Sequence, residues 1–197
     1  MKRFELLRLL DSLLPDDAVT VTSLTGTAKE WAALRRRGAN FYGLNMGLCT
    51  PLATGVALAL PDRRVIALET DGSLLLSLGS LTTLANQNPG NLIEIVFDNE
   101  CYEVCDELPT ATAGVTSLEL LARGAGIPQT QTVATREEFE QALLPALRRN
   151  VLTFIVAKIE VGTADVEERY QTLTGTRIKE DFVQALRKPG PSTVASP

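Results

Sequence analysis

Two short apolar runs, each soon followed by residues with side-chain oxygens, stand out in the hydrophobic pattern of this chain. The runs are Val65–Leu68 and Leu92–Phe97, and the pairs that follow are Asp71-Gly72 and Asp98-Asn99. Runs of this length are typical of buried strands. Leucines recur between them at helical spacing, so the region is predicted to form a strand–helix–strand unit. Parallel strands of such a unit end at the same edge of the sheet, which would bring Asp71 and Asn99 together.

The rest of the chain alternates between helical and strand-like patterns. Helices are predicted over Lys2–Leu14, Thr27–Arg37, Thr50–Leu60, Thr116–Gly126, Thr135–Arg149 and Ile178–Leu186. Strands are predicted over Ala18–Thr22, Phe41-Tyr42, Gln131–Val133 and Leu152–Ile159. Three helix starts carry capping patterns, namely Thr50 before Pro51, Thr116 with Glu119, and Thr135 with Glu138. The alternation predicts an α/β fold with a mostly parallel sheet and helices on both faces.

The composition is that of one globular domain followed by a tail. The 197 residues are 45% hydrophobic, which allows a sizeable core. A single domain is expected over residues 1–187, and the Pro- and Ser-containing end, 188–197, is expected to be disordered. The net charge of −5 argues against nucleic acid or an anionic membrane as the main partner. No apolar run approaches the roughly 20 residues that span a bilayer and no signal peptide is evident, so a cytoplasmic location is expected.

Cysteine and histidine usage excludes several kinds of site. The chain has three cysteines, Cys49, Cys101 and Cys105, and no histidine. Three cysteines cannot all pair, and a structural zinc site needs four nitrogen or sulfur ligands, so reduced structural thiols are expected. Without histidine, Ser-His-Asp and Cys-His nucleophile systems are excluded.

The pairs Asp71-Gly72 and Asp98-Asn99 indicate a binding site only when they are considered together. Either pair alone is more often a turn. At the ends of neighbouring parallel strands, however, a carboxylate and an amide oxygen are hard ligands suited to Mg²⁺, which prefers a few protein oxygens besides phosphate oxygens and water. The step Gly72-Ser73 leads towards a helix N-terminus, where free N–H groups favour a phosphate. The pattern therefore predicts one metal–diphosphate site.

A larger set of residues around this site resembles a known family. Thr70-Asp71-Gly72-Ser73, followed by Asp98-Asn99, is similar to the G-D-G-S…N-N signature of thiamine-diphosphate (ThDP) enzymes, in their diphosphate-binding (PP) domain. The small two-subunit 2-oxo acid decarboxylases, the sulfopyruvate and phosphonopyruvate decarboxylases, share further motifs. These match Met46-Gly47-Leu48, Pro61-Asp62-Arg63, Leu74-Leu75, Leu78-Gly79-Ser80-Leu81, Gln87-Asn88-Pro89, Asn91-Leu92, Tyr102 and Pro109-Thr110. The resemblance implies the ThDP-binding fold.

The resemblance also implies roles for matching residues. Asp71 and Asn99 would bind Mg²⁺ through their side chains, with the carbonyl of Cys101 as the third protein ligand. Gly72 and Ser73 would hold the diphosphate. Cofactor contacts are implied for Leu44, Met46 and Tyr102, where Met46 takes the position of the bulky apolar residue that bends the cofactor.

Three departures from the family pattern bear on activity. Thr70 replaces the first glycine of G-D-G, and Leu44-Asn45 replaces a Gly-Ser pair, which alters contacts to the aminopyrimidine ring. The acidic stretch 103–107, Glu-Val-Cys-Asp-Glu, replaces the Gly/Ser/Thr-rich segment that usually closes over the cofactor. It opens a polar loop of a length that is usually functional or mobile. These acids suit an anionic substrate poorly unless another chain supplies cations.

One half of the implied active site is missing from the chain. In the resembled family, the catalytic glutamate that activates the cofactor comes from a pyrimidine (PYR) domain, and 197 residues cannot hold both halves. The resemblance therefore implies a PYR partner subunit in a hetero-oligomer of α₂β₂ type, or a homodimer, acting on a small 2-oxo acid. The small-residue helix after Met46 and the charged C-terminal helix are candidate contact surfaces.

Three functions stay open from the sequence. The first is a ThDP- and Mg²⁺-dependent carboxy-lyase subunit. The second is the PP half of an acetolactate-synthase-like or oxo acid oxidoreductase complex, whose ferredoxin-linked form would need an iron–sulfur partner. The third is a PP-like module that binds a partner or ThDP without turnover, which Thr70 and the acidic stretch keep open.

Overall fold

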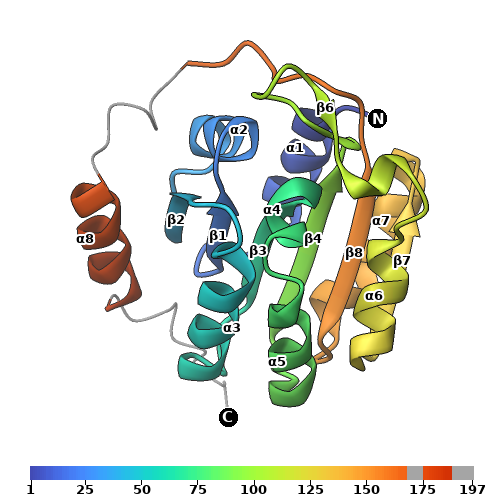
Figure 1. Cartoon of the computed structure of the whole chain (residues 1–197). Coiled ribbons are helices and arrows are strands. Elements are labelled where there is room, and N and C mark those ends of the chain that lie inside the picture. Colours follow the sequence, from blue (N-terminus) through green and yellow to red (C-terminus); the bar gives the residue numbers. More distant parts are fainter. Residues whose placement is uncertain (168–174, 188–197) are drawn as a thin grey trace.

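Six parallel strands form the centre of the molecule in the computed structural model, which describes residues 1–167 and 175–187 (Figure 1). The strand order is β2-β1-β3-β4-β8-β7. The strands are β1 (Val19–Ser23), β2 (Ala39–Leu44), β3 (Val65–Thr70), β4 (Leu92–Asp98), β7 (Gln129–Val133) and β8 (Thr153–Lys158). All neighbours in this sheet pair in parallel, so the predicted fold class is confirmed.

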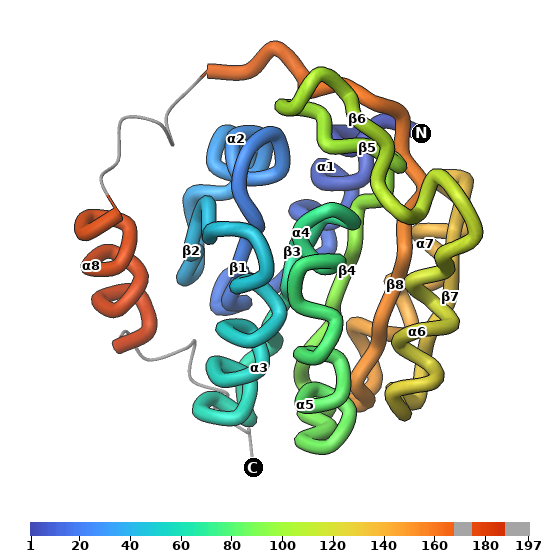
Figure 2. Tube along the Cα trace, viewed as in Figure 1, coloured from blue at the N-terminus to red at the C-terminus, as the bar shows by residue number. Residues whose placement is uncertain are grey.

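Helices cover both faces of the sheet. They are α1 (Arg3–Leu13), α2 (Gly26–Leu34), α3 (Cys49–Ala59), α4 (Asp71–Leu75), α5 (Gly79–Gln87), α6 (Leu118–Ala125), α7 (Arg136–Arg148) and α8 (Gly175–Leu186). On one face, α1, α2 and α7 bury Leu7, Trp31 and Phe139 in one apolar cluster. On the other, α3, α5, α6 and α8 contribute to a second cluster. Helices α3, α5 and α6 lie in front of the sheet in Figure 2.

Strand β3 shows why both clusters form. Val65 and Ala67 belong to the cluster under α3, whereas Ile66 and Leu68 belong to the cluster under α1. Successive side chains of a strand point to opposite faces, so a strand covered on both sides is apolar throughout. This is the physical basis of the continuous apolar runs in the sequence.

The predicted strand–helix–strand unit is confirmed, but its helix is divided. Strands β3 and β4 pair in parallel, with Thr70 opposite Phe97. The segment between them forms α4 and then α5, separated by Leu76–Leu78. The leucine spacing predicted one helix because the buried leucines of α4 and α5 together follow the spacing of a single helix face. Leu74, Leu81 and Leu84 are all buried in the same cluster.

Two of the three predicted helix caps are wrong, and one is confirmed. Helix α3 begins at Cys49, so Thr50 lies inside its first turn, where its hydroxyl donates to the buried carboxylate of Glu94. The N-cap of α6 is Ser117, one residue beyond the predicted Thr116. Thr135 and Glu138 form the predicted capping box of α7. A buried acceptor outside the helix thus overrode the local preference at Thr50.

The C-terminal region is only partly described. Helix α8 confirms the predicted helix near Ile178–Leu186 and extends it at the start. The predicted disordered tail, 188–197, lies outside the described residues. A single domain over residues 1–187 stays a prediction. Among the described residues, no helix is both long and apolar enough to cross a membrane.

Candidate cofactor and metal site

The predicted site residues gather in a pocket at the carboxyl ends of β3 and β4. The pocket is lined by Arg3, Leu24, Thr25, Met46, Thr70, Asp71, Gly72, Ser73, Phe97, Asn99, Cys101, Tyr102, Glu103, Val104 and Cys105. Every residue predicted to bind cofactor or metal is among them except Leu44. That residue ends β2 and packs against the apolar cluster under α3 instead. The prediction that Asp71 and Asn99 share one edge of the sheet is confirmed.

Asp71 is a buried carboxylate at the start of α4. Its Oδ2 accepts a hydrogen bond from Thr110 Oγ1 at 2.7 Å, and Thr112 Oγ1, which Asp71 shares with Asp98, lies 3.2 Å from the same oxygen. Burial raises the pKa of Asp71 to about 6, the hydroxyl of Thr110 opposes that shift, and the nearby charge of Asp98 adds to it. Burial disfavours the charged form of this carboxylate, and a cation beside it would stabilise that form.

Asp98 has a different role from its neighbour Asn99. Its Oδ1 accepts from Thr112 Oγ1 at 2.8 Å and from the Glu100 backbone N–H at 3.1 Å. Its Oδ2 accepts from Lys158 Nζ at 2.8 Å. Both oxygens are therefore used within the chain, and Asp98 anchors the loop that carries Thr112.

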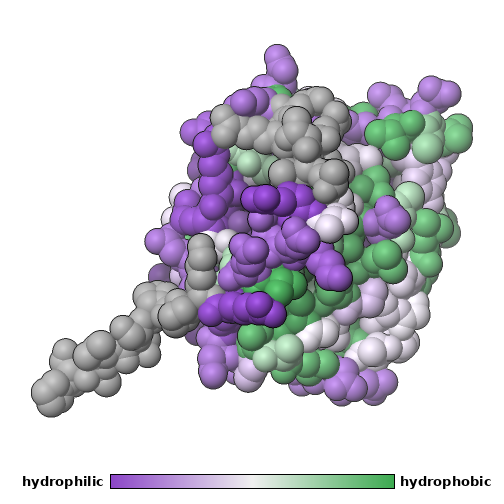
Figure 3. Space-filling view, turned by 90° about the vertical axis from the view of Figure 1, so that its left-hand side faces the viewer, coloured by the Kyte–Doolittle hydropathy of each residue, from purple (hydrophilic) through white to green (hydrophobic). Residues whose placement is uncertain are grey.

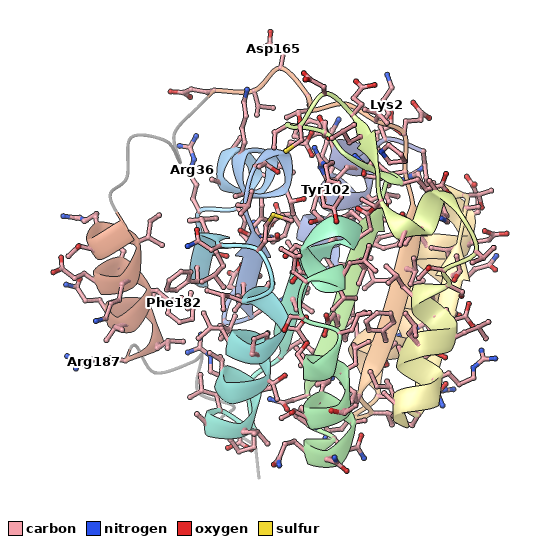
Figure 4. The ribbon with its side chains drawn as sticks, in the orientation of Figure 1. Lys2, Arg36, Tyr102, Asp165, Phe182 and Arg187 are labelled. Carbon is pink, nitrogen blue, oxygen red and sulfur yellow. The ribbon has the colours of Figure 1, made fainter. Side chains whose placement is uncertain are left out.

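Gly72 lies directly under the ring of Tyr102. A Cβ atom at Gly72 would lie 2.5 Å from Tyr102 Cε1, far inside contact distance. The next residue, Ser73, accepts a hydrogen bond from the Gly47 N–H at 3.0 Å through its Oγ. The turn before α3 and the start of α4 are thereby held together, near Tyr102, which is labelled in Figure 4.

The side-chain amide of Asn99 makes one hydrogen bond through its oxygen and one through its nitrogen. Its Oδ1 accepts from the Cys101 N–H at 3.2 Å, and its Nδ2 donates to Glu103 Oε2 at 3.3 Å. Cys101 and Tyr102 form strand β5, which pairs with β6 (Leu108–Pro109) in a two-stranded antiparallel ribbon. The acidic stretch 103–107 is the turn of this ribbon.

Arg3 lies between the pocket and the acidic stretch, a position that the sequence reasoning missed. Its guanidinium is buried and donates from Nε to Glu30 Oε2 at 2.9 Å. Its Nη1 lies 3.7 Å from Glu103 Oε2, and its Nη2 donates to Thr163 Oγ1 at 3.0 Å. Glu103 therefore shares one cation with the buried Glu30.

Thr25 is a second missed residue of the pocket. Its backbone φ of 65° and ψ of −135° are strained for a β-branched side chain. The available signal was Ser23 to Thr27, a polar, glycine-containing turn directly after a predicted strand.

Two buried glutamates lie behind the pocket, under α3. Both Glu69 on β3 and Glu94 on β4 are completely buried. Burial raises the pKa of both, that of Glu94 to about 8, and the charge of Glu69 adds to the shift at Glu94. Among the described residues, one oxygen of each carboxyl group has no hydrogen-bond partner.

The model of the family described as "Thiamine pyrophosphate enzyme, C-terminal TPP binding domain" matches residues 25–157. The chain belongs to this family. Sulfopyruvate decarboxylase subunit beta from Methanocaldococcus jannaschii is 34% identical over 158 residues, which cover 80% of this chain and 83% of that protein. The corresponding beta subunit from Methanothermobacter thermautotrophicus is 34% identical over 95% of this chain and 96% of its own.

Longer relatives share the same region. Phosphonopyruvate decarboxylase from Streptomyces viridochromogenes is 31% identical over 77% of this chain, but the match spans 38% of that protein. The crystal structure of benzoylformate decarboxylase from Polynucleobacter necessarius superposes with a TM-score of 0.72 at 21% identity, covering 83% of this chain and 34% of that one. The latter likeness shows the shared fold.

The residues present fit ThDP with Mg²⁺, the cofactor of this family. The expected ligands are a carboxylate, an amide oxygen and a main-chain carbonyl, all of them hard oxygen donors. Only glycine at position 72 lets the Tyr102 ring lie against the start of α4, because a Cβ atom there would lie 2.5 Å from Tyr102 Cε1. Among the described residues, no group of three or more His, Cys, Asp and Glu side chains could hold a metal. The proposed site does not need one, because only Asp71 contributes a charged side chain.

Proposed function

We propose that the chain is the diphosphate- and Mg²⁺-binding subunit of a ThDP-dependent 2-oxo acid decarboxylase. The observation that carries the proposal is the pocket at the joined ends of β3 and β4, which gathers Asp71, Gly72 and Asn99. Relatives named sulfopyruvate decarboxylase subunit beta support it, because the matches span most of both proteins.

Each site residue has a proposed part. Mg²⁺ is bound by Asp71, Asn99 and the carbonyl of Cys101. For Asp71 we assign Oδ1, since both threonine hydroxyls use Oδ2. Gly72 and Ser73 hold the diphosphate at the start of α4, where the first N–H groups of a helix have no partner within it. Bound ThDP supplies the electron sink for carbon–carbon cleavage, while these residues orient it.

The acidic stretch does not exclude an anionic 2-oxo acid. Glu103 lies 3.7 Å from the buried Arg3, a cation that it shares with Glu30. Asp106 and Glu107 are exposed. We propose a small 2-oxo acid as the substrate, with its distal group contacted mainly by residues of the partner.

The partner is a PYR-type subunit that supplies the glutamate absent here. Beta subunits imply a partner, and the longer relatives carry sequence beyond the matched region. The face of α3 is the proposed contact, because Leu48 and Leu58 are each about half exposed there, at 49% and 47%. In Figure 3 the more hydrophobic area lies on the right-hand side, towards the front of Figure 1 where α3 and α5 lie. A cytoplasmic location is part of this proposal.

Ligand-dependent stability tests the proposal. Thermal unfolding of the full chain, alone and with any co-purifying partner, is measured with Mg²⁺ and ThDP together and singly. Binding to the folded state raises the unfolding midpoint, so we expect stabilisation only with both. Asp71→Ala removes it. Absence of any stabilisation in the wild-type protein would reject both the decarboxylase and the other ThDP-enzyme functions.

Carbon dioxide release separates the remaining alternatives. The complex with its partner is given a panel of 2-oxo acids, and a decarboxylase releases CO₂ without an electron acceptor or a second carbonyl substrate. Release that requires a second 2-oxo acid would indicate an acetolactate-synthase-like enzyme. Stabilisation by ThDP without any turnover would indicate a binding module.

A further inference from the structure

Glu103 is the first residue of the acidic stretch, and it lines the pocket beside Asn99. It is one-quarter exposed, at 25% of its side chain, whereas Asp106 and Glu107 in the same turn are exposed. The family resemblance assigns it no role. Its contacts nevertheless connect it to one of the proposed Mg²⁺ ligands.

Two contacts fix the orientation of the Asn99 amide, one to the carboxylate of Glu103 and one from the Cys101 N–H. An asparagine side chain carries a donor nitrogen and an acceptor oxygen of similar size, and either can take either position. An ionised carboxylate can only accept hydrogen bonds. Because Glu103 Oε2 accepts from Asn99 Nδ2 at 3.3 Å, the oxygen Oδ1 must point away from Glu103. That is the side on which Oδ1 accepts from the Cys101 N–H.

Glu103 is itself held in place from two elements distant in sequence. Its Oε1 accepts from Thr163 Oγ1 at 2.9 Å, and Arg3 Nη1 lies 3.7 Å from its Oε2. Arg3 is fixed in turn by Glu30 and the Gly162 carbonyl. The orientation of the carboxylate is therefore set by contacts outside the turn that carries it.

We propose that Glu103 is a positioning residue that orients the Asn99 amide with its oxygen towards Mg²⁺. The inference rests on the proposed function, since it needs a metal at Asp71 and Asn99. Partners of this type orient metal ligands, and their loss typically weakens metal binding about 10- to 100-fold. The acidic stretch would then replace the usual small-residue segment with a side chain that supports the metal site.

Three variants of the full chain separate orientation from charge. Glu103→Met removes the acceptor, and Glu103→Gln removes the charge but keeps an oxygen that can accept from Asn99. Glu107→Gln is the matched control, because it removes the same charge from the same turn without a contact to Asn99. Arg3 keeps Glu30, Gly162 and Thr163 as partners in every variant. The fold should therefore be retained.

The measurement is the Mg²⁺ concentration that gives half of the ThDP-dependent rise in the thermal midpoint, at fixed ThDP. We expect Glu103→Met to raise this concentration about tenfold or more. Glu103→Gln should lie between Glu103→Met and the wild type, and Glu107→Gln should stay within about twofold of the wild type. Unfolding without ligands is measured in parallel, so a general loss of stability is seen separately.

A second background tests the orientation itself. In Asn99→Asp both side-chain oxygens are equivalent, so no partner is needed to orient them. Adding Glu103→Met to Asn99→Asp should then cause no loss of Mg²⁺ affinity, and it can cause a gain because two adjacent carboxylates repel. An equal loss in both backgrounds, or equal effects of Glu103→Gln and Glu107→Gln, would overturn the inference. A wild-type chain without Mg²⁺-dependent stabilisation would instead overturn the proposed function.

Discussion

Glu94 is a carboxyl group in the middle of the sheet that no solvent reaches. The hydroxyl of Thr50 donates to its Oε1, and within the described part of the chain its Oε2 has no partner. Burial raises its pKa from 4.5 to about 8, the Thr50 hydrogen bond opposes the shift, and the charge of Glu69 adds to it. Glu94 is therefore mostly protonated in the folded protein at neutral pH.

The raised pKa predicts how stability changes with pH. Between about pH 4.5 and 8, the folded state keeps a proton on Glu94 that the unfolded state releases. The free energy of unfolding should therefore fall as pH rises through this range, by up to a few kcal/mol at about 1.4 kcal/mol per unit. Glu69 contributes in the same direction.

Glu94→Gln replaces the acid with a neutral side chain of the same shape. Denaturant unfolding at pH 5 and pH 8 should show a smaller fall for this variant than for the wild type, and a higher stability at pH 8. The neighbouring surface acid Glu100, which is exposed, is the control: Glu100→Gln should leave the pH dependence nearly unchanged. Identical pH profiles for wild type and Glu94→Gln would contradict the buried-acid assignment.

Gly72 is a residue whose replacement is limited by a close contact with Tyr102. In Gly72→Ala the new methyl group would lie 2.5 Å from Tyr102 Cε1, so the ring has to move out of the pocket. We expect the free energy of unfolding to fall by about 1–3 kcal/mol, as in overpacked sites, and ThDP-dependent stabilisation to weaken. Gly124→Ala in α6 is the control, since nothing lies within 4 Å of its Cβ position. Gly124→Ala should leave the free energy of unfolding unchanged or raise it by up to about 1 kcal/mol. Equal effects of the two substitutions would show that the Tyr102 contact is unimportant.

At the scale of elements, the apolar pattern of the sequence predicted which strands and helices form, whereas capping residues did not predict where α3 begins. The strands β3 and β4 were predictable because both of their faces are buried against apolar clusters, and α7 was predictable because one of its faces is. The start of α3 was not, because Thr50 binds Glu94 across 44 positions of sequence. The metal-side residues Asp71 and Asn99 were predictable from strand ends, whereas Arg3 reaches the pocket only through tertiary packing.

Arg3 links α1 to three other segments of the chain, so its substitution should lower the free energy of unfolding strongly. It pairs with the buried Glu30 of α2 and contacts Glu103, Gly162 and Thr163. Arg3→Met leaves Glu30 buried without its cation, which typically destabilises by about 3–5 kcal/mol. Chemical denaturation should show this loss.

The adjacent residue provides the control for Arg3. Lys2 is exposed, so Lys2→Met should change the free energy of unfolding by no more than about 0.5 kcal/mol. Adding Glu30→Gln to Arg3→Met should restore part of the loss, because the uncompensated charge is then removed. A stable Arg3→Met single variant would show that the ion pair is dispensable for the fold.

At the scale of the whole molecule, helix α8 completes the core beside the edge strand β2. Its inward residues Ile178 and Phe182 are buried, and the ring of Phe182 meets Phe41 of β2 edge-on, with centroids 5.3 Å apart. Figure 4 shows Phe182 pointing from α8 towards the sheet. A helix that covers an edge strand also limits unwanted pairing with other chains. The expectation of one domain over residues 1–187 therefore depends on whether α8 unfolds together with the sheet.

Phe182→Ala tests that cooperativity. If α8 and the sheet form one unit, the variant should unfold in a single transition at a free energy lower by about 3 kcal/mol, as for other buried phenylalanines. Gln184→Ala, at an exposed position of the same helix, should differ from the wild type by less than about 0.5 kcal/mol. Unfolding followed by circular dichroism and by the fluorescence of Trp31, which lies in the opposite apolar cluster, reports on both faces of the sheet. If Trp31 unfolds at the wild-type midpoint while helical signal is lost earlier, α8 is a separate unit and the single-domain prediction is wrong.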